Sequence, residues 1–310
     1  MALALMAGAT TSDAGEPRVE PVLPVPTCTT MDGDKVRLGK RLYHDVRLSA
    51  NNSISCATCH PVDGWGMDGI PLATRVDGEK SAMNTPTVFN ALFNISQFWN
   101  GRAASLEDQI EEAVRVDMGA TWNDVLRKIS QDEEYRRTFA RVYRGGVQAV
   151  NVRDAIAEYE RSLITPNSRF DLYLRGDDQA ITAEERQGYE LFKQLGCVSC
   201  HQGVNLGGNL FQHTGIFINL ETGEPPAIGP EPDRMAVTGE VADQRVFKVP
   251  SLRNVSRTAP YFHHGDVPTL EEAVTLMARG QLGRTLSDRE RDLLVTFLRT
   301  LEGKLGGECP

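Results

Sequence analysis

Two segments of the sequence carry the pattern Cys-x-x-Cys-His: CATCH begins at Cys56, and CVSCH begins at Cys197. In this pattern the two thiols can add across the vinyl groups of a haem, and the histidine that follows can bind the haem iron. The sequence therefore predicts two covalently bound haem c groups. Their attachment residues would be Cys56, Cys59, Cys197 and Cys200, and their first axial ligands would be His60 and His201.

Two other kinds of site share part of this pattern. A redox-active Cys-x-x-Cys pair needs no histidine after it, and a zinc site needs further cysteine or histidine pairs at matched spacing. Two complete copies in one chain favour haem over both alternatives. Because haem c is attached outside the cytoplasm in bacteria, we expect a periplasmic or otherwise exported protein.

The segments around the two motifs also repeat. GKRLY at Gly39 and GYELF at Gly188 share a Gly-x-x-Leu-aromatic pattern ahead of the motifs. Further on, residues 86–113 align without gaps with residues 250–277, a register that chance seldom keeps over 28 positions. The chain is therefore predicted to be an internal duplication, with one haem motif, the same loop and the same helix in each half.

The two copies differ where this helix would cross a haem. TLEEAVTLM (residues 269–277) reads as a helix start, with Thr269 as its cap, and Met277 aligns with Ala113. A thioether can bind iron in the sixth position and raise its reduction potential, whereas an alanine methyl cannot bind iron. Core packing is the commoner role of a helical methionine, but the repeat favours a ligand. We predict a C-terminal His201/Met277 haem that accepts electrons and an N-terminal haem open to a small molecule.

Polar and aromatic side chains accompany the open haem. Gln109 lies within the predicted helix and Asp117 lies just after it. An amide and a carboxylate at an open iron could move a proton between the oxygens of a peroxide; a solvated aspartate at a turn is the alternative. Trp99 aligns with His263, and its indole could relay electrons between the haems or simply pack in the core.

The chain resembles the bacterial dihaem cytochrome c peroxidase family, which includes MauG-type enzymes, from about Asp32 to Leu301. The resemblance rests on LGKRLYHDVRLSANNSISCATCH, NTPTVFNALFNISQFWNGRA, GCVSCHQG and VPSLRNVSRTAPYFHHGD followed by LEEAVTLM. It implies a mainly α-helical fold with two cytochrome c-like domains, each with one covalent haem. The implied units are an N-terminal extension (1–30), a domain with the peroxidatic haem (31–165) and a domain that accepts electrons (166–310).

The resemblance also implies an activity and its site. Hydrogen peroxide would be reduced to water at the N-terminal haem, with electrons from a small donor protein, a cytochrome c or a cupredoxin, entering at the C-terminal haem. Calcium would lie between the domains, with water completing its shell of six to eight oxygens. Dimers occur in the family, so a homodimer is compatible with the resemblance. The implied residues are Met277 as axial ligand, Trp99 between the haems, Gln109 as distal amide, Asn84 on calcium, and the carbonyls of Thr258 and Pro260 on calcium.

Two positions depart from the family pattern. Many members carry a histidine sixteen residues after the first proximal histidine, which closes the peroxidatic haem; here that position is Val76. We infer a haem that stays open without reductive activation, with Met67 or Met83 as alternative ligands. The catalytic glutamate of the family falls on Asp117, one methylene shorter, which permits slower or altered chemistry.

Two other functions follow from the same residues. A MauG-like enzyme would oxidise a tryptophan of a partner protein, but such enzymes use an axial tyrosine on the C-terminal haem, and Met277 argues against one. The missing histidine at Val76 argues weakly for it. A plain dihaem electron carrier, with no chemistry at the first iron, is the third reading.

Composition limits the classes of partner that the protein is expected to bind. The 310 residues carry a net charge of −9, which disfavours binding to nucleic acid and to anionic membranes. No apolar run reaches the roughly 20 residues of a membrane span. MALALMAGATTSDA is apolar but lacks basic residues, which suits a clipped signal peptide or a loose N-terminus. Cys28 and Cys309 remain; they could form a disulfide or stay as free thiols.

Overall fold

The computed structural model describes residues 18–218 and 232–306, and these residues are mainly helical. We call residues 32–165 the N-terminal half and residues 166–306 the C-terminal half. The helices of the N-terminal half are α1 (Gly33–Tyr43), α2 (Cys56–Cys59), α3 (Leu106–Val116), α4 (Trp122–Ser130), α5 (Glu133–Val142) and α6 (Ala149–Ser162). Those of the C-terminal half are α7 (Arg169–Leu174), α8 (Ala183–Gln194), α9 (Met235–Thr238), α10 (Leu270–Leu282) and α11 (Asp288–Arg299).

The little sheet that the described residues contain lies in the C-terminal half. Strand β1 (Phe211–His213) pairs antiparallel with β2 (Val246–Lys248), with Phe211 opposite Lys248. Short 3₁₀ turns supply the remaining regular structure; they are η1 (Val46–Leu48), η2 (Val62–Gly64), η3 (Ala91–Phe93), η4 (Cys197–Ser199), η5 (Val241–Asp243) and η6 (Val255–Arg257). Within the described residues, no helix is long and apolar enough to cross a bilayer.

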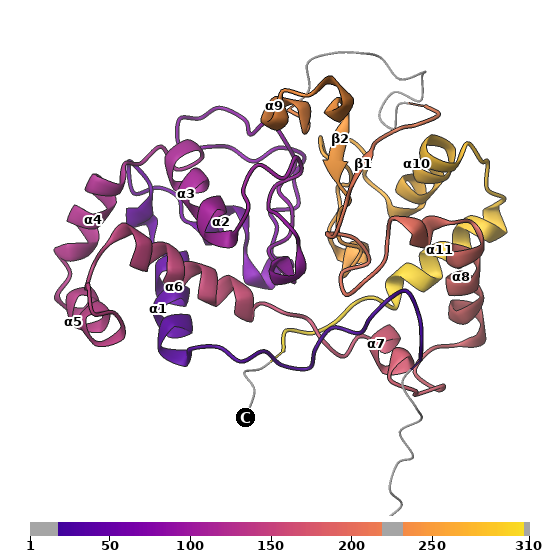
Figure 1. Ribbon diagram of the computed structural model, residues 1–310, viewed down its shortest axis with the longest axis horizontal. Helices are drawn as coiled ribbons and strands as arrows, with labels where there is room; N and C mark the ends of the chain where they lie inside the picture. Colours follow the sequence, from indigo (N-terminus) through magenta and orange to yellow (C-terminus); the bar gives the residue numbers. More distant parts are fainter. Residues whose placement is uncertain (1–17, 219–231, 307–310) are drawn as a thin grey trace, which may run out of the picture.

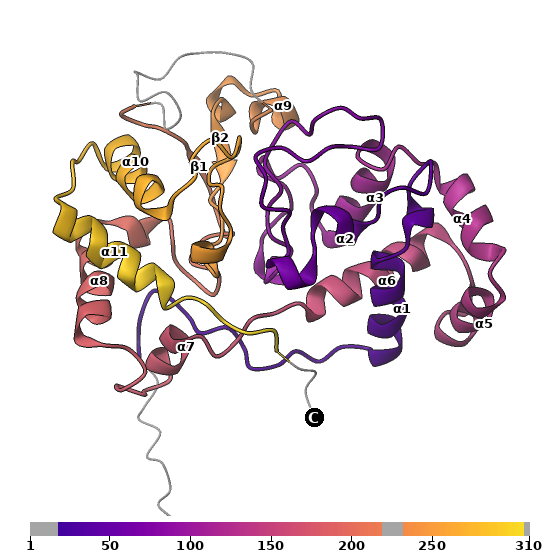
Figure 2. The same ribbon diagram turned by 180° about the vertical axis from the view of Figure 1, so that it is seen from behind.

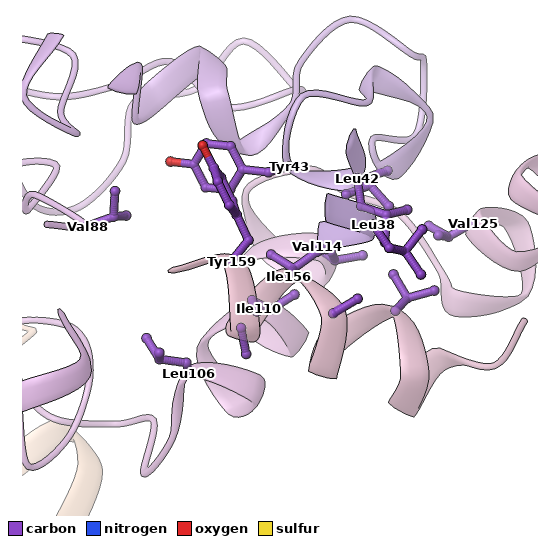
Figure 3. Packing of buried hydrophobic residues seen from close by; sticks show 14 of the residues in the cluster. Leu38, Leu42, Tyr43, Val88, Leu106, Ile110, Val114, Val125, Ile156 and Tyr159 are labelled. Carbon is purple, nitrogen blue, oxygen red and sulfur yellow. The ribbon is translucent and has the colours of Figure 1, made fainter. Parts of the chain in front are cut away.

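Each half has a hydrophobic cluster of its own, and the halves form separate lobes (Figures 1 and 2). The first cluster draws only on residues 31–163, and the second draws on residues 170–301 together with Val22. In the first, Tyr43 of α1 packs edge to face against Tyr159 of α6, with ring centroids 5.1 Å apart (Figure 3). Edge-to-face pairs of this kind add to the free energy gained by burying the rings.

The two predicted lead-ins fold alike. A methyl group on Gly39 would lie 1.8 Å from the carbonyl oxygen of Ala155, so α1 can approach α6 this closely only at a glycine. In the C-terminal half, a methyl group on Gly188 of α8 would lie 2.1 Å from the carbonyl oxygen of Leu293 in α11. The Gly-x-x-Leu-aromatic pattern thus marks the same helix crossing in each half.

The longer repeat is confirmed in the backbone. Asn90 and Asn254 share a left-handed conformation (φ 61° and 60°), and so do Phe98 and Phe262 (φ 65° and 66°). Antiparallel bridges follow at equivalent places, Gln97 with Ala103 and Tyr261 with Val267. The helices after the loops are capped alike: the hydroxyl of Ser105 accepts the N–H of Asp108, and that of Thr269 accepts the N–H of Glu272.

One buried hydroxyl joins the two copies. The side-chain amides of Asn90 and Asn254 both donate to Oγ1 of Thr165, at 2.8 and 2.9 Å. Thr165 is 1% exposed, and its own N–H donates to Oδ1 of Asn90. The oxygen of Asn254 accepts the N–H of Gly303 in the same way. The two asparagines therefore meet at Thr165, between α6 and α7.

The ends of the described chain lie along this junction (Figures 1 and 2). Residues 18–31 contain no helix and run against the C-terminal half, where the N–H of Leu23 donates to the carbonyl of Gly203. Cys28 is disulfide-bonded. Its expected partner, Cys309, and the proposed signal remnant in residues 1–14 lie outside the described residues.

Candidate active site

A cavity of about 300 Å³ lies in the N-terminal half. It brings together residues that are far apart in the chain and that the sequence assigns to haem attachment, peroxide chemistry, electron relay and calcium binding. Those in its wall are Cys56, Cys59, His60, Asn84, Trp99, Gln109, Ala113 and Asp117.

The histidines of the two motifs are held in the same manner. Nδ1 of His60 lies 3.0 Å from the carbonyl oxygen of Gly66, and Nδ1 of His201 lies 2.9 Å from that of Leu206. Each bond fixes the ring and leaves Nε2 as the nitrogen for a metal. Burial lowers the pKa of both imidazoles, so the neutral form that binds iron is favoured. Both residues fit an axial haem ligand.

The four cysteines of the motifs are free thiols and half-buried. Burial raises the pKa of Cys59 and of Cys197 to about 11, so neither is a reactive thiolate at neutral pH. Cys56 and Cys59 are separated by one turn of α2 and both line the cavity. This placement suits two thioether bonds to one haem.

Helix α3 presents two different faces. Leu106, Ile110 and Val114 are spaced four apart and enter the first hydrophobic cluster. Gln109, Ala113 and Asp117 have the same spacing on the neighbouring face, and all line the cavity. Gln109 and Asp117 therefore lie one turn before and one turn after Ala113, the residue that aligns with Met277.

Asp117 ends α3 and is half-buried. Burial raises the pKa of its carboxyl group, and the guanidinium groups of Arg102 and Arg75 act in the opposite direction. A carboxyl group with a raised pKa exchanges its proton closer to neutral pH, which suits it to proton transfer. The alternative of a fully solvated turn aspartate is not what the structure shows.

The loop that carries Val76 is bound to this end of α3. The N–H of Val76 donates to the carbonyl of Asp117 at 3.0 Å, and a methyl group on Gly119 would lie 2.7 Å from the Val76 side chain. Met83 lines the cavity, whereas Met67 is 3% exposed and its sulfur accepts the N–H of Gly69. Of the two alternative methionine ligands, only Met83 is in the cavity wall.

Trp99 lies where the cavity meets the C-terminal half. Its indole N–H donates to the carbonyl of Asn84 at 2.9 Å, and its own carbonyl accepts the N–H of Lys248 in β2 at 2.7 Å. Its ring is 6.2 Å from that of His263, which stacks on Phe247 at 4.4 Å. Aromatic rings thus continue from the cavity wall into the C-terminal half.

The equivalent face of α10 carries different side chains. Ala273, Met277 and Gln281 occupy the places of Gln109, Ala113 and Asp117. Met277 is half-buried, and its neighbours Val274 and Leu276 pack on the second cluster together with Cys197. The side chain of Gln281 is hydrogen-bonded to the backbone. Its amide nitrogen donates to the carbonyl of His213, and its oxygen accepts the N–H of Ile216.

The proposed calcium residues lie at the contact between the halves. The N–H of Asn84 donates to the carbonyl of His263, and its side-chain amide donates to the carbonyls of Ile70 and Pro71, which leaves its oxygen as an acceptor. The carbonyls of Thr258 and Pro260 accept no hydrogen bond from any described residue. Three open oxygens suit calcium but supply only part of its shell. Elsewhere in residues 18–218 and 232–306, no cluster of three acidic, histidine or cysteine side chains could hold a metal.

Two buried ionisable side chains were not predicted from the sequence. Glu160 of α6 is 4% exposed and lines the cavity, and burial raises its pKa to about 8. Lys248 is 8% exposed, burial lowers its pKa to about 8, and its ammonium makes no ion pair with any described residue. A buried amine without an acid partner fits one of the carboxylates that a haem carries. In the sequence, a charge four residues after Ile156 on a buried helix face was the available signal for Glu160.

Comparisons with known proteins give a consistent result. A family model described as di-haem cytochrome c peroxidase matches residues 33–179. The chain is 46% identical over 298 residues to the cytochrome c peroxidase Ccp of Escherichia coli (strain K12), which covers 95% of this chain and 64% of that protein. The chain thus spans less than two thirds of the length of that relative.

Two further matches cover nearly all of both proteins. The cytochrome c551 peroxidase of Nitrosomonas europaea is 39% identical over 305 residues, covering 97% of this chain and 90% of the relative. A solved structure of a MauG-like protein associated with microbial copper homeostasis superimposes with a TM-score of 0.79 at 26% identity, covering 96% of each chain.

Proposed function

The chain belongs to the di-haem cytochrome c peroxidase family, and on that basis we propose that it reduces hydrogen peroxide to water at the cavity of the N-terminal half. It is an oxidoreductase of the cytochrome c peroxidase type. The reaction takes up two protons and two electrons for each peroxide, H2O2 + 2 H⁺ + 2 e⁻ → 2 H2O.

Membership in the family implies two haem c groups. We assign their attachment to the two Cys-x-x-Cys pairs, with His60 and His201 as proximal ligands, one in each of two cytochrome c-like domains (31–165 and 166–310). When bound, the haem groups supply the one-electron chemistry and an iron that can hold peroxide. The hydrogen-bonded imidazoles, the free thiols and the buried Lys248 support this assignment.

The contrast between Ala113 and Met277 carries the proposal. The two residues occupy equivalent positions of one repeat, but Ala113 lines a cavity together with Gln109 and Asp117. Met277 has no such partners, because Gln281, its equivalent of Asp117, binds backbone. We therefore place peroxide in the N-terminal half and assign Met277 as the sixth ligand of the C-terminal haem.

Gln109 and Asp117 then have separate tasks. The amide of Gln109 can donate a hydrogen bond to bound peroxide and orient it. The carboxylate of Asp117 can accept the proton of the inner peroxide oxygen and return it to the outer oxygen, which leaves as water. The raised pKa of Asp117 supports this exchange.

Electrons are proposed to arrive from a small cytochrome c or a cupredoxin at the C-terminal half and to cross at Trp99 and His263. We propose calcium at Asn84, Thr258 and Pro260, where it would hold the two halves together beside Trp99. A periplasmic location follows from covalent haem attachment, and a homodimer is proposed from the family resemblance alone.

Steady-state turnover of the holoprotein with reduced cytochrome c tests the proposal. We expect peroxide-dependent oxidation of the donor well above a free-haem control, and an oxidised EPR spectrum with one high-spin and one low-spin haem. Two low-spin haems without turnover would instead identify an electron carrier. A long-lived oxidised state that modifies a partner protein, with no rapid turnover, would identify a MauG-like enzyme.

A further inference from the structure

Arg75 belongs to a short loop that is fixed beside Asp117. Thr74 and Lys80 form an antiparallel bridge, and the N–H of Arg75 donates to the carbonyl of Glu79 at 2.8 Å. The next residue, Val76, donates its N–H to the carbonyl of Asp117 at 3.0 Å. The backbone on both sides of Arg75 is therefore held against the end of α3, and Arg75 itself lines the cavity.

The guanidinium group of Arg75 has an unused donor. One terminal nitrogen donates to Oδ2 of Asp77 at 2.8 Å, which orients the group. Its Nε is buried and has no hydrogen-bond partner among the described residues. Leaving a buried charged donor unpaired costs about 1–3 kcal/mol or more, so such a group is expected to have a partner that the chain itself does not provide.

The second arginine in the cavity wall differs in this respect. Nε of Arg102 donates to Glu112 at 2.5 Å, a terminal nitrogen lies 3.4 Å from the side-chain oxygen of Asn100, and the group stacks over the ring of Phe98. Arg102 is thus bound by the chain. Arg75 is the arginine in this cavity whose Nε–H is still available.

We propose that Arg75 is a catalytic residue that donates a hydrogen bond from its Nε to the outer oxygen of bound peroxide. This inference rests on the proposed function and names a further residue of the same site. When the O–O bond breaks, the outer oxygen keeps the bonding electron pair, takes from Asp117 the proton that the inner oxygen gave up, and leaves as water. Two electrons from the donor protein and two protons from solvent then convert the remaining oxygen to the second water.

Arg75 stabilises charge in this step and does not transfer a proton. A guanidinium group stays protonated at any physiological pH, so it can only donate hydrogen bonds and balance negative charge on the departing oxygen. A fixed donor at the place where charge develops is worth about 10²–10³-fold in rate in other enzymes. This role suits a site whose carboxylate is an aspartate, because the hydrogen bond from Arg75 supplies part of the stabilisation of the departing oxygen and the shorter side chain need not supply all of it.

The experiment compares Arg75→Gln and Arg75→Lys with Arg127→Gln in the holoprotein. Arg127 pairs with Asp124 on the exposed face of α4, so its substitution makes the same change of charge outside the cavity. Fluoride binding to the oxidised N-terminal haem, followed by visible absorption, reports hydrogen bonding to an iron-bound anion without turnover. The kcat/KM for peroxide is measured in parallel.

We expect Arg75→Gln to weaken fluoride binding by at least about tenfold, the loss of one charged hydrogen bond, and to lower kcat/KM by about 10²-fold. Arg75→Lys should recover part of both, and Arg127→Gln should match the wild type. Unchanged fluoride affinity in Arg75→Gln overturns the inference, even if the haem potential shifts, because Arg75 would then pair with a haem carboxylate. Wild-type iron that binds no fluoride overturns it as well. Normal fluoride results without any peroxide turnover would instead reject the proposed function.

Discussion

The rings of Trp99 and His263 lie edge to face, with centroids 6.2 Å apart and an interplanar angle of 62°. The two residues hold the same position in the two copies of the repeat, thirteen residues after Pro86 and Pro250. The contact therefore joins equivalent residues of the two copies, one of them in the wall of the N-terminal cavity and the other in the C-terminal half. It is a short path between the halves.

Replacing Trp99 by phenylalanine should slow electron transfer between the halves. The substitution keeps an aromatic ring but removes the indole and its hydrogen bond to Asn84. We expect the second electron to reach the N-terminal haem about tenfold more slowly, equivalent to roughly 1.4 kcal/mol in the barrier, as measured by stopped-flow absorption after rapid reduction. Trp122→Phe is the control, because Trp122 donates to Glu111 on the far side of α3. Equal rates in both variants would remove Trp99 from the path.

Replacing Met277 by alanine should free the sixth position of the C-terminal iron. The haem should change from low to high spin, and its reduction potential should fall by on the order of 0.1 V, within the roughly 0.8 V range that axial ligands cover. EPR and spectroelectrochemistry measure the two effects. Met235→Ala, a half-buried methionine of α9, should change neither. A low-spin C-terminal haem in Met277→Ala would show that another residue is the ligand.

The reciprocal change, Ala113→Met, should close the N-terminal haem. Ala113 lines the cavity at the position equivalent to Met277, the proposed ligand of the other iron, so a thioether there should bind the N-terminal iron. We expect a second low-spin signal and a loss of at least about 10²-fold in peroxide turnover, since the substrate position would be filled. Retained activity with an unchanged spectrum would contradict the equivalence of α3 and α10.

Asp117→Asn should remove proton transfer while leaving the shape of the cavity intact. We expect kcat to fall by about 10²–10⁴-fold, whereas Asp117→Glu should stay within about tenfold of the wild type. Because burial raises the pKa of Asp117 and the ionised form accepts the proton, kcat/KM should fall as pH decreases through this raised value. The asparagine variant should lack that acidic limb. An unaltered pH profile would assign the proton to another group.

Glu160 should make the holoprotein less stable at alkaline pH. Its folded pKa of about 8 lies above its unfolded value of 4.5, so the folded state holds the proton more tightly. The resulting stability is complete below about pH 4.5 and is lost as pH rises through about 8. Glu160→Gln should therefore lose less free energy of unfolding than the wild type between pH 5 and pH 8, by on the order of a few kcal/mol.

Urea denaturation at the two pH values measures this difference. Glu158→Gln, on the same helix and ion-paired with Arg161, is the matched control and should follow the wild type. Parallel stability curves for Glu160→Gln and the wild type would show that Glu160 is ionised in the folded protein.

The sequence predicted the parts of the site that follow from repetition and spacing. The haem motifs, the 28-residue repeat and the spacing of Gln109, Ala113 and Asp117 are local patterns, and the structure confirms the repeat and brings these residues into one cavity. The cap at Thr269 is confirmed for the same reason, since it depends on residues three apart.

What the sequence did not predict depends on contacts between distant segments. Arg75 and Glu160 reach the same cavity from a loop and from α6, and neither belongs to a motif. The buried state of Lys248 depends on β2 lying against the loop of Trp99, a contact that spans 149 positions of the chain. Such residues become recognisable only when distant segments of the chain are packed together.

The shared hydroxyl of Thr165 has a mechanical consequence. Because the amides of Asn90 and Asn254 donate to the same oxygen, both bonds survive only those movements of the halves that leave this atom nearly in place. The backbone bonds from Asn84 to His263 and from Lys248 to Trp99 join the same halves at a second region. A movement that preserves the bonds at Thr165 but rotates one half about it breaks these contacts, so the two regions together fix the distance that electrons must cross.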